Sequence, residues 1–304
     1  MMSEGSTFRA GYCAIVGIPN AGKSTLLNAL LGTKLSIISH KPQTTRKRVL
    51  GIHSTADSQI IFLDTPGIMP RPSTLHHKAL LEEVRTSFND ADVILALAEA
   101  NKSADRALPQ EWAKYVELAA GKPIILGLSK IDLIKDKKEL LPILAPYNSL
   151  PEFREIIPFS STKKQNTDRL LSLITKFLPE GQPLYDTEQL SDQNERFFVA
   201  ELIREGVFHR FRDEIPYSTE VVIEEFTERE AGKWYISAEI LVERDSQKGI
   251  IIGDKGEALK ALGASARREI EHFLGHSVFL ELRVKTRDDW RNDKRALKSL
   301  GYQF

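Results

Sequence analysis

One eight-residue stretch constrains the fold of this 304-residue chain more than any other, and it reads Gly17-Ile18-Pro19-Asn20-Ala21-Gly22-Lys23-Ser24. Residues 11–16 before it form an apolar run typical of a buried strand, and residues 24–31 after it have the pattern of a helix. A stretch of this pattern between a strand and a helix is typical of a phosphate-binding loop. Its backbone N–H groups surround phosphate oxygens at the helix N-terminus, its lysine reaches the β- and γ-phosphates, and its hydroxyl binds Mg²⁺. We therefore expect Lys23, Ser24 and the rest of the stretch, with Thr25, to bind a nucleoside triphosphate. The alternative is a glycine-rich turn without a ligand.

The composition is that of an ordinary globular protein, with 41% hydrophobic and 28% charged residues. A chain of this length usually forms two domains, and it has no run of about 18 apolar residues that would span a bilayer. Its first eight residues lack the layout of a secretory signal, so we expect a cytoplasmic protein. Its single cysteine, Cys13, excludes an intramolecular disulfide, and its place in the first strand predicts a small core residue.

The formal net charge is zero, but the charges are unevenly distributed. Residues 1–178 hold 23 Lys and Arg against 17 Asp and Glu. Residues 179–243 hold 6 basic against 16 acidic side chains, whereas residues 244–304 hold 13 against 9. A basic segment at the end of the chain therefore follows an acidic one, which is a pattern to expect where one face binds a polyanion.

Two polar features after the phosphate loop are placed to bind the metal and the γ-phosphate. Residues 33–48 form a long polar stretch without apolar periodicity, in the position of a phosphate-sensing switch. The strand-like run 59–63 ends in Asp64-Thr65-Pro66-Gly67. An aspartate at the carboxyl end of a parallel strand can hold Mg²⁺, and the Gly67 N–H can meet a γ-phosphate. The alternative for this tetrapeptide is a plain turn, because Asp, Pro and Gly all favour turns.

The order of apolar runs and helical patterns predicts an α/β domain. We expect strands over 49–53, 59–63, 93–97, 123–128 and 156–159, and helices over 75–88, 108–119, 140–150 and 168–178. This alternation predicts a parallel sheet with helices on both faces. Ser129-Lys130-Ile131-Asp132 follows one strand, and Asp132 can accept the two N–H groups that guanine presents and adenine does not.

The pattern changes after a proline-containing acidic segment, 179–192, which we interpret as a linker. We expect a helix over 194–212, strands over 218–226 and 234–242, a helix after Gly253-Asp254-Lys255-Gly256, a strand over 278–284 and a last element over 289–300. This order predicts a small α+β domain. Five basic side chains lie on the Gly-x-x-Gly loop and the helix after it, where single-stranded nucleic acid would pass: Lys248, Lys255, Lys260, Arg267 and Arg268. The alternative is a helix-initiating turn without a ligand.

These motifs, in this order, resemble those of the Era GTPases over nearly the whole chain. The resemblance implies a P-loop NTPase domain over 9–178 with a mostly parallel sheet, a linker over 179–193 and a type II KH domain over 194–304. Gln43-Thr44-Thr45-Arg46 resembles the first switch of the family. From related GTPases we expect Thr45 to be the switch ligand of Mg²⁺, beside Ser24 and Asp64, with Thr44 as the alternative.

The resemblance also has departures that bear on chemistry. Ser129 stands where the family usually has Asn, so we expect guanine specificity with weaker binding or a water-filled gap. Ser160-Ser161-Thr162 replaces the usual Ser-Ala, at small expected cost because the contact to the base is through backbone N–H. Ile68 follows Gly67, which excludes a glutamine that orients water. In related GTPases with this replacement, an Asn matching Asn20 binds K⁺, so we expect Lys23, Asn20 and Thr45 to be the catalytic residues.

For function, the resemblance implies a Mg²⁺-dependent GTPase that binds GTP, GDP and the 3′ end of 16S rRNA, and that acts in assembly of the 30S subunit as a monomer. Two interpretations remain open: turnover of GTP times release from the ribosomal precursor, or GTP gates an RNA-binding checkpoint in which hydrolysis is incidental. A third is a GTPase of transfer-RNA modification or membrane signalling. The basic segment 41–48 has three open interpretations: it contacts RNA, it contacts lipid headgroups peripherally at the cell membrane, or it is a solvated loop. We expect His76 and His77 to be solvated rather than catalytic.

Overall fold

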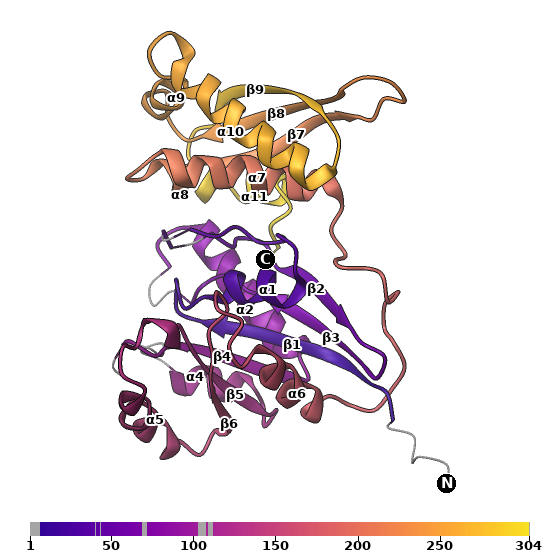
Figure 1. Cartoon of the computed structure of the whole chain (residues 1–304). Helices are drawn as coiled ribbons and strands as arrows, with labels where there is room; N and C mark the ends of the chain where they lie inside the picture. The colour runs from indigo at the N-terminus through magenta and orange to yellow at the C-terminus, as the bar shows by residue number, and fades with distance from the viewer. Residues whose placement is uncertain are drawn as a thin grey trace. The chain divides into compact units, whose positions relative to one another are not determined.

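The structure is a computed structural model that describes residues 7–39, 41–42, 44–68, 72–102, 108 and 112–303. The chain forms two compact units, drawn in Figure 1. Residues 1–36, 45–72 and 80–192 make up the first unit, and residues 37–44, 73–79 and 193–304 make up the second. No helix in the described part of the chain is long and apolar enough to cross a membrane.

The first unit is built on a six-stranded sheet with the order β2-β3-β1-β4-β5-β6. Its strands are β1 (Arg9–Gly17), β2 (Val49–Ser54), β3 (Ser58–Asp64), β4 (Val93–Glu99), β5 (Ile124–Ser129) and β6 (Phe153–Pro158). All neighbours pair in parallel except β2 and β3, which form an antiparallel hairpin. The predicted mostly parallel sheet is confirmed, and the carboxyl ends of β1, β3, β4 and β5 meet at one edge.

Helices cover both faces of this sheet, each over its own apolar core (Figure 1). On one face lie α1 (Lys23–Leu31) and α6 (Thr167–Phe177), whose leucines and isoleucines pack on the sheet. On the other lie α2 (Leu75–Asp90), α4 (Trp112–Leu118) and α5 (Leu140–Asn148). Cys13 is fully buried in the first of these cores, as predicted for a small core residue, and burial raises the pKa of its thiol.

The segment predicted to be a linker is tied to the edge of this sheet. The Gln59 side chain accepts hydrogen bonds from the N–H groups of Leu184 and Tyr185 and donates to the Tyr185 carbonyl. Further along, the Ile52 N–H of edge strand β2 donates to the Leu190 carbonyl at 2.9 Å. Residues 179–192 thus contain no helix or strand but follow a fixed course along the first unit.

The second unit has a three-stranded sheet with the order β7-β8-β9. Strands β7 (Glu220–Thr227) and β8 (Trp234–Val242) are antiparallel, and β9 (Val278–Thr286) is parallel to β8. Helices α7 (Glu195–Arg210) and α10 (Glu257–Leu274) share an apolar core with it. Shorter helices are α8 (Ile215–Ser218), α9 (Asp245–Ile252) and α11 (Lys294–Ser299). The predicted small α+β domain is confirmed.

Helix α9 was not predicted. The run Ile250-Ile251-Ile252 is β-branched and favours a strand, yet only Ile251 is buried in the core, whereas Ile250 is 52% exposed. The Gln247 side chain accepts hydrogen bonds from the N–H groups of Glu243 and Arg244, which stabilises the first turn. The capped first turn and the buried positions Gln247 and Ile251 therefore stabilise a helix, although the isoleucine run by itself favours a strand.

The prediction that His76 is solvated is wrong. Its side chain is 1% exposed and lies in the second unit, with ring centroids 5.4 Å from Trp290 and 4.8 Å from Tyr302. Aromatic packing, which needs residues more than 200 positions away, has no local signal in the sequence. His77, its neighbour, is half-buried, and its Nδ1 lies 3.1 Å from the Ser73 hydroxyl.

Candidate functional site: a phosphate loop, a base-binding turn and a Gly-x-x-Gly turn

The phosphate loop connects β1 to α1 and owes its shape to backbone conformations that glycine favours. Gly22 precedes the helix with φ 98°, and a Cβ on Gly17 would lie 2.7 Å from the Leu97 carbonyl oxygen. The Lys23 ammonium donates to the Gly17 and Ile18 carbonyls, each at 3.2 Å. Burial lowers the pKa of Lys23 to about 8, and nearby Asp64 opposes the shift. The loop therefore holds a buried cation beside the N–H groups of a helix N-terminus, which suits phosphate.

Three oxygen-bearing side chains meet at the end of the loop. Ser24 Oγ lies 3.0 Å from Thr45 Oγ1, and both hydroxyls donate to Asp64 Oδ2, at 3.0 Å and 3.3 Å. Burial raises the pKa of Asp64, whereas Lys23 and the surrounding hydroxyls oppose the shift. A carboxylate and two hydroxyls are the hard oxygen donors that Mg²⁺ prefers, so the cluster fits this ion. The described residues contain no group of three or more His, Cys, Asp or Glu side chains that could hold a metal.

The tetrapeptide after β3 packs directly on the phosphate loop. The Ile68 N–H donates to the Gly17 carbonyl at 3.1 Å, and Thr65 Oγ1 donates to the Ile15 carbonyl at 2.7 Å. A Cβ on Gly67 would lie 2.9 Å from Pro19 Cγ, so glycine is required for this approach. Ile68 is 3% exposed and belongs to the apolar core, which leaves no side-chain amide at this position to orient water.

The turn after β5 is joined to the same loop. Ser129 Oγ donates to the Ala21 carbonyl at 2.7 Å and approaches the Ala98 carbonyl at 3.2 Å. The Lys130 ammonium donates to the Asn20 carbonyl at 2.7 Å. Although a serine is shorter than the asparagine usual in the Era family, it still connects this turn to the phosphate loop.

Asp132, the residue predicted to select guanine, is exposed and oriented by Ser160. The Ser160 hydroxyl donates to Asp132 Oδ1 at 2.5 Å and lies 3.2 Å from Thr162 Oγ1. Ser160 is fully buried, whereas Ser161 makes no hydrogen bond through its side chain among the described residues. The sequence predicted only a backbone contact for this motif, so the side chain that supports Asp132 was not foreseen.

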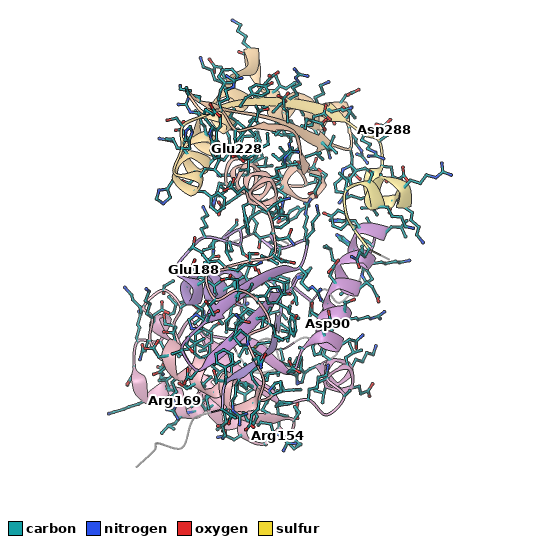
Figure 2. The ribbon with its side chains drawn as sticks, turned by 90° about the vertical axis from the view of Figure 1, so that its right-hand side faces the viewer. Asp90, Arg154, Arg169, Glu188, Glu228 and Asp288 are labelled. Atoms are coloured by element: carbon teal, nitrogen blue, oxygen red, sulfur yellow. The ribbon has the colours of Figure 1, made fainter. Side chains whose placement is uncertain are left out.

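The basic switch segment is more engaged than a solvated loop. Arg46 is 2% exposed, Arg48 forms an ion pair with Asp90 at the end of α2, and Figure 2 labels Asp90 there. In the second unit, the Lys41 ammonium donates to the Phe208 and Phe211 carbonyls at the end of α7. Gln43 lies outside the described residues. These internal contacts leave few of the segment's charges for RNA or lipid headgroups.

The second candidate site is the turn between α9 and α10. Gly253, Lys255 and Gly256 all have positive φ, at 73°, 48° and 83°, and a Cβ on Gly253 would lie 2.6 Å from that of Ala258. Lys255 and Asp254 are exposed at its tip. The turn therefore presents backbone at the N-terminus of an 18-residue helix, as phosphate binding requires.

The predicted RNA-binding cations fall into two groups along this unit. Lys248, Lys255 and Lys260 lie at or next to the turn, on α9, the turn itself and the first turn of α10. Arg267 and Arg268 are exposed further along α10, about 16 Å beyond Gly256 at 1.5 Å per residue. Among the described residues, no ion pair neutralises any of the five.

Some of the acidic side chains in residues 179–243 are buried and paired within the protein, so they do not face RNA. Glu220 accepts a hydrogen bond from Tyr302 at 2.7 Å and is 3% exposed, and Glu243 is paired with Arg291. Four exposed acids lie on or next to the β7–β8 hairpin, where Figure 2 labels Glu228: Glu224, Glu225, Glu228 and Glu230. The other exposed acids that this segment contributes to the second unit lie at α7 and before α8: Glu195, Asp213 and Glu214.

Comparison with protein families finds two matches in the expected order. A model described as "50S ribosome-binding GTPase" matches residues 12–130, and a KH-domain model matches residues 214–291. GTPase Era of Geotalea daltonii is 47% identical over 296 residues, which cover 97% of this chain and 98% of that protein. GTPase Era of Geobacter metallireducens is 46% identical over 298 residues, with the same coverage.

Solved structures with the whole architecture are also similar. A crystal structure of an Aquifex aeolicus Era variant bound to GDP and AlF₄⁻ has a TM-score of 0.92 and 42% identity, and covers 98% of this chain and all of that one. A structure of Era with MgGDPNP and nucleotides 1506–1542 of 16S ribosomal RNA has a TM-score of 0.91 with the same identity and coverage. Identity at this level over nearly the full length of both proteins, with the phosphate loop and the Gly-x-x-Gly turn in place, shows that this chain belongs to the GTPase Era family.

Proposed function

We propose that this GTPase binds the 3′ end of 16S rRNA through its second unit and acts in assembly of the 30S subunit. The observation that carries the proposal is one chain that joins a phosphate loop to an exposed, left-handed Gly-x-x-Gly turn with three lysines at or next to it. The related Era with MgGDPNP and 16S rRNA nucleotides supports this assignment. The domains would then be a G domain over 9–178, a linker over 179–193 and a KH domain over 194–304.

In the nucleotide site we assign roles from the contacts described above. Lys23 and the loop N–H groups would bind the phosphates, Asp132 and the segment 160–162 the guanine, and Lys130 and Ser129 would hold the base-binding turn against the loop. Ser24, Thr45 and Asp64 would hold Mg²⁺, which supplies charge neutralisation at the β- and γ-phosphates when bound. Thr45 rather than Thr44 belongs to this cluster, because its hydroxyl approaches Ser24 and Asp64.

Crosslinking of bound RNA in cells, followed by sequencing, tests the RNA partner. We expect reads to concentrate at the 3′ end of 16S rRNA and to fall in a Gly256→Asp variant, because an added carboxylate and a lost left-handed glycine disrupt the turn. Reads that spread over transfer RNAs, or that do not depend on Gly256, would contradict the proposal.

A second candidate is a GTP-gated RNA-binding checkpoint in which hydrolysis is incidental. Buried Ile68 favours it, because the position after Gly67 offers no side chain to activate water. Asp64→Ala, which removes the metal carboxylate, separates the two candidates when it is compared with Gly256→Asp. Normal 30S maturation with Asp64→Ala, together with failure of Gly256→Asp, would favour the checkpoint. Failure of both, with GTP binding retained by the Asp64→Ala protein, would favour an enzyme whose turnover is required.

A further inference from the structure

The carboxylate of Glu99 occupies a buried position at the edge of the nucleotide site, and no sequence motif marks it. Glu99 is the last residue of β4, its side chain is 6% exposed, and in the sheet register it lies opposite Ser129 of β5. Its Oε2 accepts a hydrogen bond from the Lys130 ammonium at 2.8 Å, and its Oε1 accepts one from Lys102. Burial by itself would raise the pKa of Glu99, but the two ammonium groups lower it. The carboxylate is therefore ionised and held between two cations.

The Lys130 ammonium, in turn, joins Glu99 to the phosphate loop. It donates to Glu99 and, at 2.7 Å, to the carbonyl of Asn20. Lys130 and Asn20 both have left-handed backbone conformations, with φ 63° and 67°, which cost energy in residues other than glycine and persist where surrounding contacts hold them. The neighbouring Ser129 hydroxyl holds the next loop carbonyl, that of Ala21. Two successive residues of the base-binding turn thus contact two successive carbonyls of the phosphate loop.

We propose that Glu99 is a positioning residue of the nucleotide site, which holds the Lys130 ammonium on the Asn20 carbonyl and so keeps the base-binding turn in register with the phosphate loop. This inference rests on the proposed nucleotide-binding function. The Lys130 side chain is 34% exposed, so without the carboxylate its flexible ammonium would return to water, where it is well hydrated. A site that must order this turn on binding loses affinity, because the ordering cost is subtracted from the binding free energy.

Glutamate suits this position better than a neutral side chain for a physical reason. A hydrogen bond between two charged groups is about twice as strong as one between neutral groups, and burial protects it from screening by salt. Glutamine at 99 has the same shape but offers only a neutral oxygen to two ammonium groups. Glu99→Gln therefore changes the strength of the contact with little change in packing.

The experiment measures the affinity and dissociation rate of a fluorescent GDP analogue with the full-length protein. We expect Glu99→Gln to weaken binding about tenfold, mainly through faster dissociation, as for the loss of one charge-assisted hydrogen bond. Glu155→Gln is the matched control, since it removes the same charge from an exposed pair with Lys176 in the same unit. Affinity of Glu99→Gln equal to that of the wild type would overturn the inference.

A double variant distinguishes positioning through Lys130 from a general structural role. If Glu99 acts through Lys130, the change Glu99→Gln has no further effect on GDP dissociation once Lys130→Met is present. Additive losses would show that Glu99 acts in another way and would overturn the proposal. Where Glu99→Gln fails to fold, Glu99→Asp, which keeps the charge on a shorter side chain, serves in the same comparison. A wild type that does not bind GDP would instead contradict the proposed nucleotide site.

Discussion

Ser24 and Thr45 hold their hydroxyl oxygens 3.0 Å apart although they come from different segments of the chain, the phosphate loop and the switch. Both hydroxyls also donate to the same oxygen of Asp64, which is fully buried. Hydroxyls that share one carboxylate oxygen are already oriented as a cation would need them. The switch is thereby connected to the phosphate loop through side chains that a metal would bind.

Replacement of Thr45 with alanine should reduce Mg²⁺-dependent hydrolysis, whereas the same change at Thr44 should not. Thr45→Ala removes one of the clustered oxygens, and loss of one partner at a metal site typically costs about 10- to 100-fold in metal affinity or activity. The measurement is GTP turnover as a function of Mg²⁺ concentration, with Thr44→Ala as the adjacent control. Equal losses in the two variants would show that the cluster is not the metal site.

Replacement of Ser160 with alanine should weaken guanine nucleotide binding. Its hydroxyl donates to Asp132 at 2.5 Å, and a hydrogen bond to a charged group contributes about 1.5–3 kcal/mol. We expect GDP affinity to fall about tenfold or more, measured by fluorescence titration. Ser161→Ala is the matched control because the Ser161 side chain is not bonded to Asp132, and a similar loss there would contradict the role of Ser160.

Potassium should accelerate hydrolysis, and Asn20 should be required for this effect. The position after Gly67 is buried Ile68, which offers no polar side chain to the reaction. A bound cation can supply the compensation that the developing negative charge needs. We expect faster turnover in KCl than in NaCl for the wild type, and equal turnover in the two salts for Asn20→Ala. Equal rates in both salts for the wild type would exclude the idea.

The motifs that local spacing defines were predictable from the sequence. The phosphate loop and Asp132 follow buried strands and Asp64 ends one, and parallel strands bring their carboxyl ends to one edge of the sheet. The predicted sheet with helices on both faces and the small α+β unit followed from apolar periodicity in the same way. These features depend on neighbours in the chain, which is why a single sequence reveals them.

The supporting contacts were not predictable, because their partners are distant in the sequence. Glu99 resembles an ordinary strand end until Lys130, 31 residues later, is seen beside it. Glu220 adds to the acidic segment by charge alone, yet its partner Tyr302 is 82 residues away and both are buried. Buried polar side chains satisfy their hydrogen bonds through tertiary structure, and periodicity carries no information about those partners.

The stability of the protein should fall as the pH drops from 7 to 5, in part through His53. Burial lowers the pKa of His53 below its ordinary 6.5, while a backbone hydrogen bond with Leu30 opposes the shift. Between the folded-state pKa and 6.5 the unfolded chain binds more protons, so the free energy of unfolding decreases as pH falls through that window. Denaturant unfolding of His53→Gln should show a weaker dependence there. The control His272→Gln replaces an exposed histidine at the end of α10, and equal slopes in all three proteins would contradict the prediction.

Lysines at the Gly-x-x-Gly turn should contribute to RNA affinity through phosphate contacts, and the salt dependence of binding should reveal them. Removal of one lysine–phosphate interaction with single-stranded RNA lowers the slope of log affinity against log salt by about 0.7. We expect Lys255→Ala and Lys260→Ala to show this change and a several-fold decrease in affinity for a 16S rRNA 3′-end oligonucleotide. Lys285→Ala is the control, because Lys285 is 64% exposed on β9 and pairs with Glu239. A slope that changes for Lys285→Ala but not for Lys255→Ala would place the RNA on the sheet rather than on the turn.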